Sequence, residues 1–447
     1  MKRKIKILAF TGTRADYPRV KKVFERLDKD SKFILKIVAS GTHLLKEYGN
    51  TYKEIKKDGF NIYKKIKIYE SDFDTLFGAS KAISNCIIKF GKILNKFKPD
   101  MVIITVDRIE TLGAAIPASI MNFPIVHIQG GEVTGTIDEN IRHAVTKLSH
   151  VHMVSNEDAK KRVIRLGENK KNVFNVGCPY IDLIKSTPII SKKKLFKKLK
   201  LDDQKQTIIL IQHAVTTEYG ESKNQIEQTL KSLEKIDKNK FQIIAIYSNA
   251  DPGSKEIIKN IKKRKFILNK NLESGEFISL MHYSKLIIGN SSSGIREAPS
   301  FKLTAINIGS RQNRRLRAKN VIDVNHDVKE ISRSDSGAFN LSETSDKILE
   351  IINYSKENNI KSICFVTGVP GSGKTLAGLN IANKRNNSEK NQYTVFLSGN
   401  QPLVDVLQES LARDEVKRKK IRKKEALQKT KAFIQNIHHF RDDHLDL

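Results

Sequence analysis

Short apolar runs alternate with amphipathic stretches along the first 200 residues of the chain. Lys4–Phe10, Met101–Val106 and Ile125–Ile128 have the length and composition of buried strands, whereas Arg19–Leu27 and Ala114–Met121 have the spacing of helices. Parallel strands must be joined by a crossover, which is usually a helix. This rhythm therefore predicts a parallel sheet with helices on both faces.

The same rhythm starts again after residue 201. Thr207–Ile211 and Phe241–Tyr247 are predicted strands, and the Lys-rich amphipathic stretch Ser191–Leu201 is a predicted linker between the two halves. The sequence thus predicts an α/β protein with two Rossmann-like domains, residues 1–185 and 202–331. Ligands of such domains bind in the crevice at the carboxyl ends of the strands.

The composition is typical of a globular protein. Hydrophobic residues make up 39% of the 447 residues, and the mean hydropathy is −0.42. No apolar run approaches the roughly 18 residues that a membrane span needs, and the apolar start is too short for a secretory signal. We therefore expect a cytoplasmic protein with no membrane partner. Cys86, Cys178 and Cys364 lie far apart, so we expect reduced thiols and no metal.

A net charge of +32 raises the question of nucleic-acid binding. Most of the basic residues are lysines spread along solvated helices, whereas bidentate recognition of phosphate favours clustered arginine. The sequence therefore argues against nucleic-acid binding by residues 1–331. One dense cluster, Arg413–Lys431, has ten Lys or Arg against three Asp or Glu, and this basic helix is the one candidate for such binding.

Two loops have the features of phosphate-binding segments. Thr11–Asp16 follows the first strand, and Gly289–Glu297 follows a strand of the second half. The N–H groups at the start of the next helix can bind an anion, although a capped helix start would look like the first loop. Glu297 is a candidate acceptor for ribose hydroxyls. The candidate phosphate ligands are Arg14, Ser291, Ser292 and Arg311.

Carboxylates follow the strands between these loops. Asp107 comes directly after an apolar strand, and Glu132 and Asp138 follow the next strand across a Gly-Gly turn. A helix N-cap is the alternative role for Asp107. Several carboxylates that converge on a Gly-Gly loop favour acid–base chemistry. His213 ends another apolar strand, which favours a place in the cleft.

Residues 1 to about 330 resemble the hydrolysing UDP-N-acetylglucosamine (UDP-GlcNAc) 2-epimerases, which begin sialic-acid synthesis. The resemblance implies a glycosyltransferase-B-like fold, a UDP-sugar substrate, no cofactor and a homo-oligomer. It also implies conversion of UDP-GlcNAc and water to N-acetylmannosamine and UDP. The segments that carry it are Arg14–Tyr17, Asp107–Arg108, His127–Glu132, Thr136–His150, His213 with Val215–Glu218, Ser291–Glu297 and Gly309–Arg311.

The implied mechanism eliminates UDP to give a glycal and then adds water with the opposite configuration at C2. Asp107 and Asp138 match the family's catalytic acids, and burial would raise their pKa toward neutrality. Glu297 matches the residue that holds the ribose, and Arg108 and Asn249 match further UDP contacts. The groups that would stabilise the leaving diphosphate are Arg14, His213, Ser291, Ser292 and Arg311.

The sequence departs from the family pattern at Gln129, where the family often has Glu. A glutamine cannot exchange a proton usefully. Two alternatives stay open: Glu132 joins the catalytic set, or Asp107 and Asp138 act alone. The sugar is open as well, because relatives act on UDP-diacetylbacillosamine and no motif separates the two substrates. The resemblance fades near Ile331.

A complete P-loop pattern lies in the last hundred residues. Gly368, Gly373, Lys374 and Thr375 have the spacing that cradles phosphates and binds Mg²⁺, which makes ATP with magnesium the candidate ligand. Residues 345–447 resemble the opening of a P-loop ATPase family with helicase-like relatives. No apolar run that ends in Asp-Glu follows residue 404, so we expect a truncated P-loop segment that binds nucleotide weakly without competent hydrolysis.

The leading hypothesis is therefore a hydrolysing UDP-GlcNAc 2-epimerase. One rival is a P-loop nucleotide-binding protein that acts on nucleic acid, supported by the P-loop, the basic helix and the charge. Another is an inactive fusion, in which missing bracing helices leave the cleft too loose for catalysis.

Overall fold

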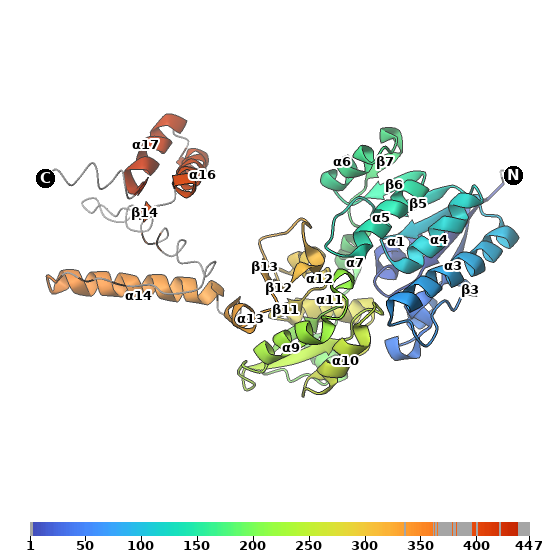
Figure 1. Cartoon of the computed structure of the whole chain (residues 1–447), viewed down its shortest axis with the longest axis horizontal. Coiled ribbons are helices and arrows are strands. Elements are labelled where there is room, and N and C mark those ends of the chain that lie inside the picture. The colour runs from blue at the N-terminus through green and yellow to red at the C-terminus, as the bar shows by residue number, and fades with distance from the viewer. Residues whose placement is uncertain are drawn as a thin grey trace. The chain divides into compact units, whose positions relative to one another are not determined.

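The computed structural model describes residues 3–334, 337–360, 362, 364, 378, 381, 396–398, 401–419 and 422–436. The chain divides into two compact units, Met1–Ser334 and Asp335–Leu447. Figure 1 shows two twisted sheets flanked by helices in the first unit. Both sheets are entirely parallel, as the sequence predicts.

The first sheet has the strand order β3-β2-β1-β4-β5-β6-β7. The order reverses between β1 and β4, which is the place where ligands bind in open α/β sheets. Its strands are β1 Ile5–Thr11, β2 Phe33–Ala39, β3 Ile62–Lys65, β4 Met101–Thr105, β5 Ile125–Ile128, β6 Val151–Val154 and β7 Val173–Asn175. Its helices are α1 Tyr17–Lys29, α2 Tyr52–Lys57, α3 Leu76–Phe97, α4 Ile109–Ile120, α5 Ile137–Leu148, α6 Glu157–Arg165 and α7 Pro179–Ser186.

The second sheet has the order β10-β9-β8-β11-β12-β13, with its own reversal between β8 and β11. Its strands are β8 Gln206–Ile211, β9 Phe241–Ile246, β10 Ile267–Asn269, β11 Leu286–Gly289, β12 Thr304–Ile308 and β13 Val321–Val324. Its helices are α8 Lys192–Leu199, α9 Ser222–Leu233, α10 Ser254–Lys262, α11 Ser274–Tyr283, α12 Ser293–Arg296 and α13 Val328–Ser334.

Each sheet buries apolar side chains on both faces. In β1, Leu8 and Phe10 belong to one core, whereas Ile7 and Ala9 belong to the core on the opposite face. This alternation follows from the two-residue repeat of a strand. Helices cover both faces, so the central strands read as continuous apolar runs. The ends of these strands are thus fixed by packing and can hold polar groups in place.

The stretch 191–201 is not the linker that the sequence predicts. It forms α8, whose Leu195, Phe196 and Leu199 are buried in a core of the second domain with Leu280 of α11. The lysines of α8 lie on its outer side, as the amphipathic sequence indicates, but the helix packs as part of the second domain. The second domain therefore begins before residue 202.

The second unit is described in part. Its described elements are α14 Gly337–Glu357, β14 Phe396–Ser398, α16 Gln401–Lys419, α17 Lys423–Phe433 and β15 Ile434–Asn436, and β14 pairs in parallel with β15. The basic cluster 413–431 lies largely in α16 and α17. The P-loop residues Gly368, Gly373, Lys374 and Thr375 lie outside the described residues. The partial P-loop fold of this segment stays a prediction.

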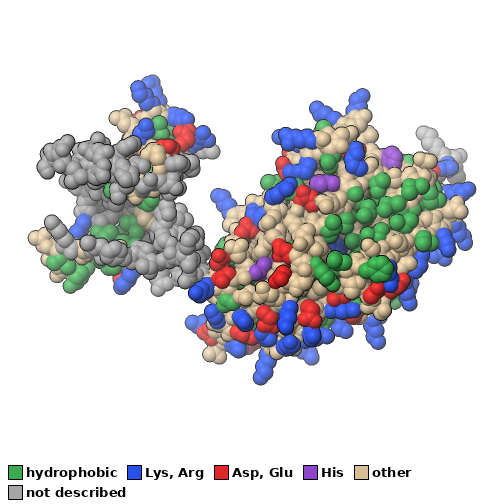
Figure 2. All heavy atoms as spheres, in the orientation of Figure 1, with side chains coloured by type: hydrophobic (Ala, Val, Ile, Leu, Met, Phe, Trp, Pro, Cys, Tyr) green, Lys and Arg blue, Asp and Glu red, His purple; other side chains and the backbone are tan. Residues whose placement is uncertain are grey.

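One surface of the first unit carries few charges. Figure 2 shows hydrophobic side chains gathered over α3 and α4, where Phe77, Ile88 and Ile120 are exposed. The only charged residue of α4 is Glu110, and it is fully buried. Such a face is typical of a surface that another chain covers, and the expected homo-oligomer stays a prediction. No helix in the described part of the chain is long and apolar enough to cross a membrane.

Candidate active-site cleft

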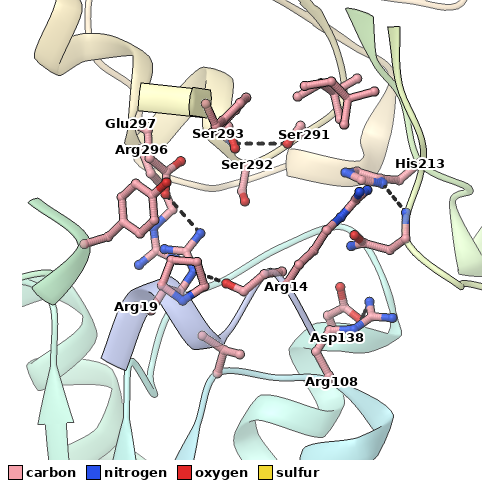
Figure 3. Close-up of a pocket in the computed structure, with 18 of the residues that line it drawn as sticks. Arg14, Arg19, Arg108, Asp138, His213, Ser291, Ser292, Ser293, Arg296 and Glu297 are labelled. Atoms are coloured by element: carbon pink, nitrogen blue, oxygen red, sulfur yellow. Dashed lines mark hydrogen bonds and ion pairs between the residues drawn. The ribbon is translucent and has the colours of Figure 1, made fainter. Parts of the chain in front are cut away.

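A cleft of about 1130 Å³, partly open to solvent, lies between the two domains. Its walls come mainly from the segments after β1, β4 and β5 on one side and after β8, β9, β10, β11 and β12 on the other. Figure 3 shows the serines after β11 and His213 along one wall and Arg19, Arg108 and Asp138 along the other. Ten sequence-predicted residues line it together: Arg14, Asp107, Arg108, Asp138, His213, Asn249, Ser291, Ser292, Glu297 and Arg311.

The loop after β1 is held by Asp16. Its carboxylate accepts hydrogen bonds from the Thr11 hydroxyl at 2.6 Å and from the backbone N–H groups of Gly12 and Thr13 at 2.9 and 3.1 Å. Arg14 reaches across the cleft (Figure 3) and donates to the backbone carbonyl of Tyr247 in the second domain. Burial lowers the pKa of Arg14 to about 10. The loop therefore places a half-buried cation where the domains meet.

Asp107 follows a strained backbone position. Val106 has a φ of +60°, a conformation that costs a residue other than glycine roughly 1–3 kcal/mol. The Asp107 carboxylate pairs with the guanidinium of Arg142, which is 1% exposed. Burial opposes ionisation of Asp107, but Arg142 and Arg315 outweigh that effect and hold its pKa well below the ordinary range. Arg108, not Asp107, occupies the N-cap position of α4.

Asp138 lies in the first turn of α5. Its carboxylate oxygens are 3.7 Å from Nη1 of Arg108 and 3.5 Å from Nη2 of Arg311. Burial raises the pKa of Asp138, and the charge of Asp107 adds to this effect against the opposing charge of Arg108. The predicted rise in pKa therefore holds for Asp138 and is wrong for Asp107, because Arg142 binds only the latter directly.

His213 is held as a hydrogen-bond donor. Its Nδ1 accepts a hydrogen bond from the backbone N–H of Asn249 at 3.0 Å, so the ring proton lies on Nε2. Asn290 fixes the same backbone by two hydrogen bonds, of 2.7 Å from the His213 N–H and 2.9 Å to its carbonyl. Burial and the charges of Arg311 and Arg14 lower the pKa of His213 well below its usual value. A neutral imidazole therefore donates from Nε2.

Hydroxyls and an open acceptor lie around α12. Ser291, Ser292 and Ser293 line the cleft, and the Ser293 N–H donates to the Ser291 hydroxyl at 3.3 Å. One oxygen of Glu297 is 3.1 Å from Nη2 of Arg19. The other, Oε2, is buried without a hydrogen-bond partner among the described residues. A ligand hydroxyl would supply the hydrogen-bond donor that this oxygen lacks.

Glu132 is not among the residues that line the cleft, which argues against the catalytic role that the sequence offers for it as one of two alternatives. Its two carboxylate oxygens pair with Arg296 at 2.8 Å and Arg315 at 3.3 Å, both from the second domain. Burial opposes its ionisation, but these two arginines outweigh that effect and lower its pKa. A carboxylate held in this way is an ionised structural group.

Gln129 also lies outside the lining of the cleft. It is 2% exposed, its Nε2 donates to the Cys178 sulfur at 2.9 Å, and its Oε1 accepts from Arg19 at 3.4 Å. Both polar atoms of the Gln129 amide thus have hydrogen-bond partners, a neutral sulfur and a guanidinium. Of the two alternatives left open by the sequence, the geometry favours Asp107 and Asp138 acting without Glu132.

Replacing Glu132 by glutamine should destabilise the fold by about 3 kcal/mol, because two buried arginines lose their shared charge partner. UDP release per folded molecule should stay within about tenfold of the parent protein. Thermal or denaturant unfolding and a UDP assay measure the two effects. Glu139→Gln is the matched control: its partner Arg314 is 72% exposed, so its loss should cost less than about 1 kcal/mol. If Glu132→Gln leaves stability unchanged but abolishes UDP release, Glu132 takes part in catalysis.

Two parallel α/β domains that face each other across a cleft define a glycosyltransferase-B-like protein. A crystal structure of UDP-GlcNAc 2-epimerase from Neisseria meningitidis bound to UDP-GlcNAc has this fold, with a TM-score of 0.63 and 21% identity. The alignment covers 76% of this chain and 92% of that chain.

The chain belongs to the UDP-N-acetylglucosamine 2-epimerase family, whose model matches residues 25–365. It is 40% identical over 327 residues to GDP/UDP-N,N'-diacetylbacillosamine 2-epimerase (hydrolyzing) of Campylobacter jejuni, covering 72% of this chain and 84% of that protein. It is 33% identical over 330 residues to UDP-N-acetylglucosamine 2-epimerase of N. meningitidis, covering 73% and 85%. The UDP-GlcNAc 2-epimerase family predicted from the motifs is confirmed, and the hydrolysing reaction stays a prediction.

The end of the chain is similar to a different family. Residues 361–447 match the Schlafen group 3 DNA/RNA helicase domain. This match agrees with the helicase-like relatives that the sequence predicts for the segment, and nucleotide binding there stays a prediction.

Proposed function

We propose that the chain is a hydrolysing 2-epimerase that converts a UDP-2-acetamido sugar and water into UDP and the free sugar with inverted C2. The observation that carries the proposal is the pair Asp107 and Asp138, which line one cleft with pKa values displaced in opposite directions. Two carboxyl groups whose pKa values are shifted in opposite directions are suited to opposite roles in proton transfer.

The leaving UDP would bind along the wall of the second domain. Ser291 and Ser292 offer hydroxyls, and the Nε2–H of His213 offers a neutral donor. Arg311 adds a positive charge for the diphosphate as negative charge develops on it. The unpartnered Oε2 of Glu297 would accept hydrogen bonds from the ribose hydroxyls.

In the first step, ionised Asp107 would take the proton from C2 while the bond between C1 and the diphosphate oxygen breaks. A C1=C2 double bond forms, and the products of this step are a glycal and UDP. Arg142 keeps Asp107 ionised beforehand. The proton that Asp107 gains leaves to solvent, which matches the one proton that the overall hydrolysis releases.

In the second step, protonated Asp138 would deliver its proton to C2 from the opposite face of the ring. Water adds to C1, and the proton that water loses returns to Asp138. The raised pKa of Asp138 favours the protonated form that this step needs. C2 thus gains a proton on the face opposite to the one it lost.

Two sugars are candidates. The identity of 40% to a diacetylbacillosamine epimerase exceeds the 33% to a UDP-GlcNAc epimerase, which favours UDP-N,N'-diacetylbacillosamine over UDP-GlcNAc. Either product would be a precursor of sialic-acid-type sugars.

The test is incubation of the full chain with each UDP-sugar in D₂O. We expect release of UDP and of a free sugar with inverted C2 and one deuteron at that carbon, read by mass spectrometry and NMR. A product that keeps UDP would contradict hydrolysis. Failure of both sugars to release UDP from folded protein would contradict the proposal as a whole.

For the C-terminal segment we propose weak nucleotide binding through Lys374 and Thr375, supported by the P-loop pattern and the helicase match. Lys374→Ala should abolish binding of labelled ATP and leave UDP release unchanged. Binding that survives this change would contradict the proposal.

A further inference from the structure

His127 lies in β5 beside the turn that carries Asp107. It is 0% exposed, and its Nε2 lies 2.9 Å from the carbonyl oxygen of Val106. Val106 is the strained residue with φ of +60°, and Asp107 follows it directly. The Val106 N–H is bonded to the Ile128 carbonyl at 2.9 Å. Both polar groups of the strained residue are therefore held by β5 residues.

The other ring nitrogen of His127 contacts the helix that carries the second carboxylate. Nδ1 lies 3.2 Å from the hydroxyl of Thr146 in α5, the helix of Asp138 and Arg142. The imidazole thus lies between the turn that holds Asp107 and the helix that holds its charge partner. A rigid ring with partners at both ends fixes their separation better than a flexible chain can.

The first glycine of the Gly-Gly turn makes room for this ring. A Cβ at Gly130 would lie 2.8 Å from Nδ1 of His127 and 3.0 Å from the Thr146 hydroxyl. These distances are too short for non-bonded atoms, so a side chain at 130 would displace the ring. Gly130 therefore serves the placement of His127.

The protonation state of the ring follows from its partners. A carbonyl oxygen can only accept, so Nε2 carries the proton and donates to Val106. Burial lowers the pKa of His127 to about 4, so the ring is neutral at ordinary pH and Nδ1 carries no proton. The Thr146 hydroxyl beside it has two acceptors within reach, Nδ1 at 3.2 Å and the Arg142 carbonyl at 3.0 Å.

We propose that His127 is a positioning residue that holds Val106 in its strained conformation through the Val106 carbonyl and so aims the Asp107 carboxylate into the cleft. The expected loss of kcat rests on the proposed function. The expected change in the backbone at Val106 rests on the geometry alone. No contact of His127 with the substrate is required.

The chain offers a matched control in His152. It is the register partner of His127 on β6, is 1% exposed, and pairs with Glu168 away from the cleft. His127→Leu and His152→Leu each remove a buried imidazole and should both lower the melting temperature. Only His127→Leu should lower kcat, by about 10²-fold, because a displacement of about 1 Å at a reacting group has that effect. KM should stay within about twofold, because the UDP wall is untouched.

A conservative variant tests the hydrogen bond itself. The amide of His127→Gln can still donate to the Val106 carbonyl, so it should recover most of the lost kcat. Thr146→Val removes the hydroxyl beside Nδ1 together with its bond to the Arg142 carbonyl, and it should lower kcat less than His127→Leu does because the bond to Val106 stays. Equal kcat losses in His127→Leu and His152→Leu would overturn the inference, as would a His127→Gln variant no more active than His127→Leu.

A crystal structure of the full chain carrying His127→Leu separates this inference from the proposed function. If the leucine variant does not fold, the structure of His127→Gln takes its place. In the leucine variant, Val106 should leave the left-handed region and Asp107 should turn from Arg142; in the glutamine variant both should keep their places. The inference is overturned if Val106 keeps its positive φ in the leucine variant, or if it loses that φ in the glutamine variant. These readouts hold even if the parent protein releases no UDP.

Discussion

Asp107→Asn should lower the rate of UDP release by about 10³-fold, the loss typical of a missing general base. The amide keeps the shape of the side chain but cannot take the C2 proton. It also leaves the buried charge of Arg142 without its partner. UDP itself should still bind, because the serines and His213 are unchanged. The rate is measured by coupled UDP detection and the binding by calorimetry.

The control for this variant is Asp58→Asn. Asp58 is also an ion-paired aspartate of the first domain, but its partners are Lys21 and the Tyr17 hydroxyl, away from the cleft. Its replacement should leave the rate of UDP release close to that of the parent. A rate for Asp107→Asn that is also close to the parent's would contradict the assignment of the base.

Asp138→Asn should have a different effect, because it blocks the second step. UDP should still be released, but the free epimer should form about 10³-fold more slowly and the glycal should accumulate. NMR of the reaction mixture distinguishes the glycal from the finished sugar. Release of neither UDP nor glycal would place Asp138 in the elimination step instead.

The pH dependence of the parent should follow from the same assignment. The folded-state pKa of Asp138 is raised, so its acid form is present below that pKa and is lost as pH rises through it. Formation of the epimer should therefore slow toward high pH, with glycal accumulating as it does in Asp138→Asn. Asp107, with its lowered pKa, stays ionised over the same range.

Much of the fold could be predicted from the sequence because the central strands are buried on both faces. β1, β4 and β8 read as apolar runs for that reason. The edge strands β3 and β10 have only four and three residues and are interrupted by Lys or Asn, so no run marks them. The amphipathic pattern of α8 is visible in the sequence, but its three apolar side chains do not show which core they enter.

The positions of the candidate site residues could be predicted, but their pairings could not. Strand ends and glycine turns indicate which side chains reach the cleft, because those features are local. Glu132 differs, since its partner Arg296 lies 164 residues further along the chain. Likewise, only the packing of α5 shows that Arg142 binds Asp107. Charge partners far apart in sequence decide which carboxylate is free to react.

The lining of the cleft has a consequence for how this chain can vary. Among the described residues, every side chain that lines it comes from residues 14 to 315, and Ile331 of α13 completes the apolar layer beneath the second sheet. Substitutions beyond Ser334 would therefore remove none of the side chains that line the cleft among the described residues.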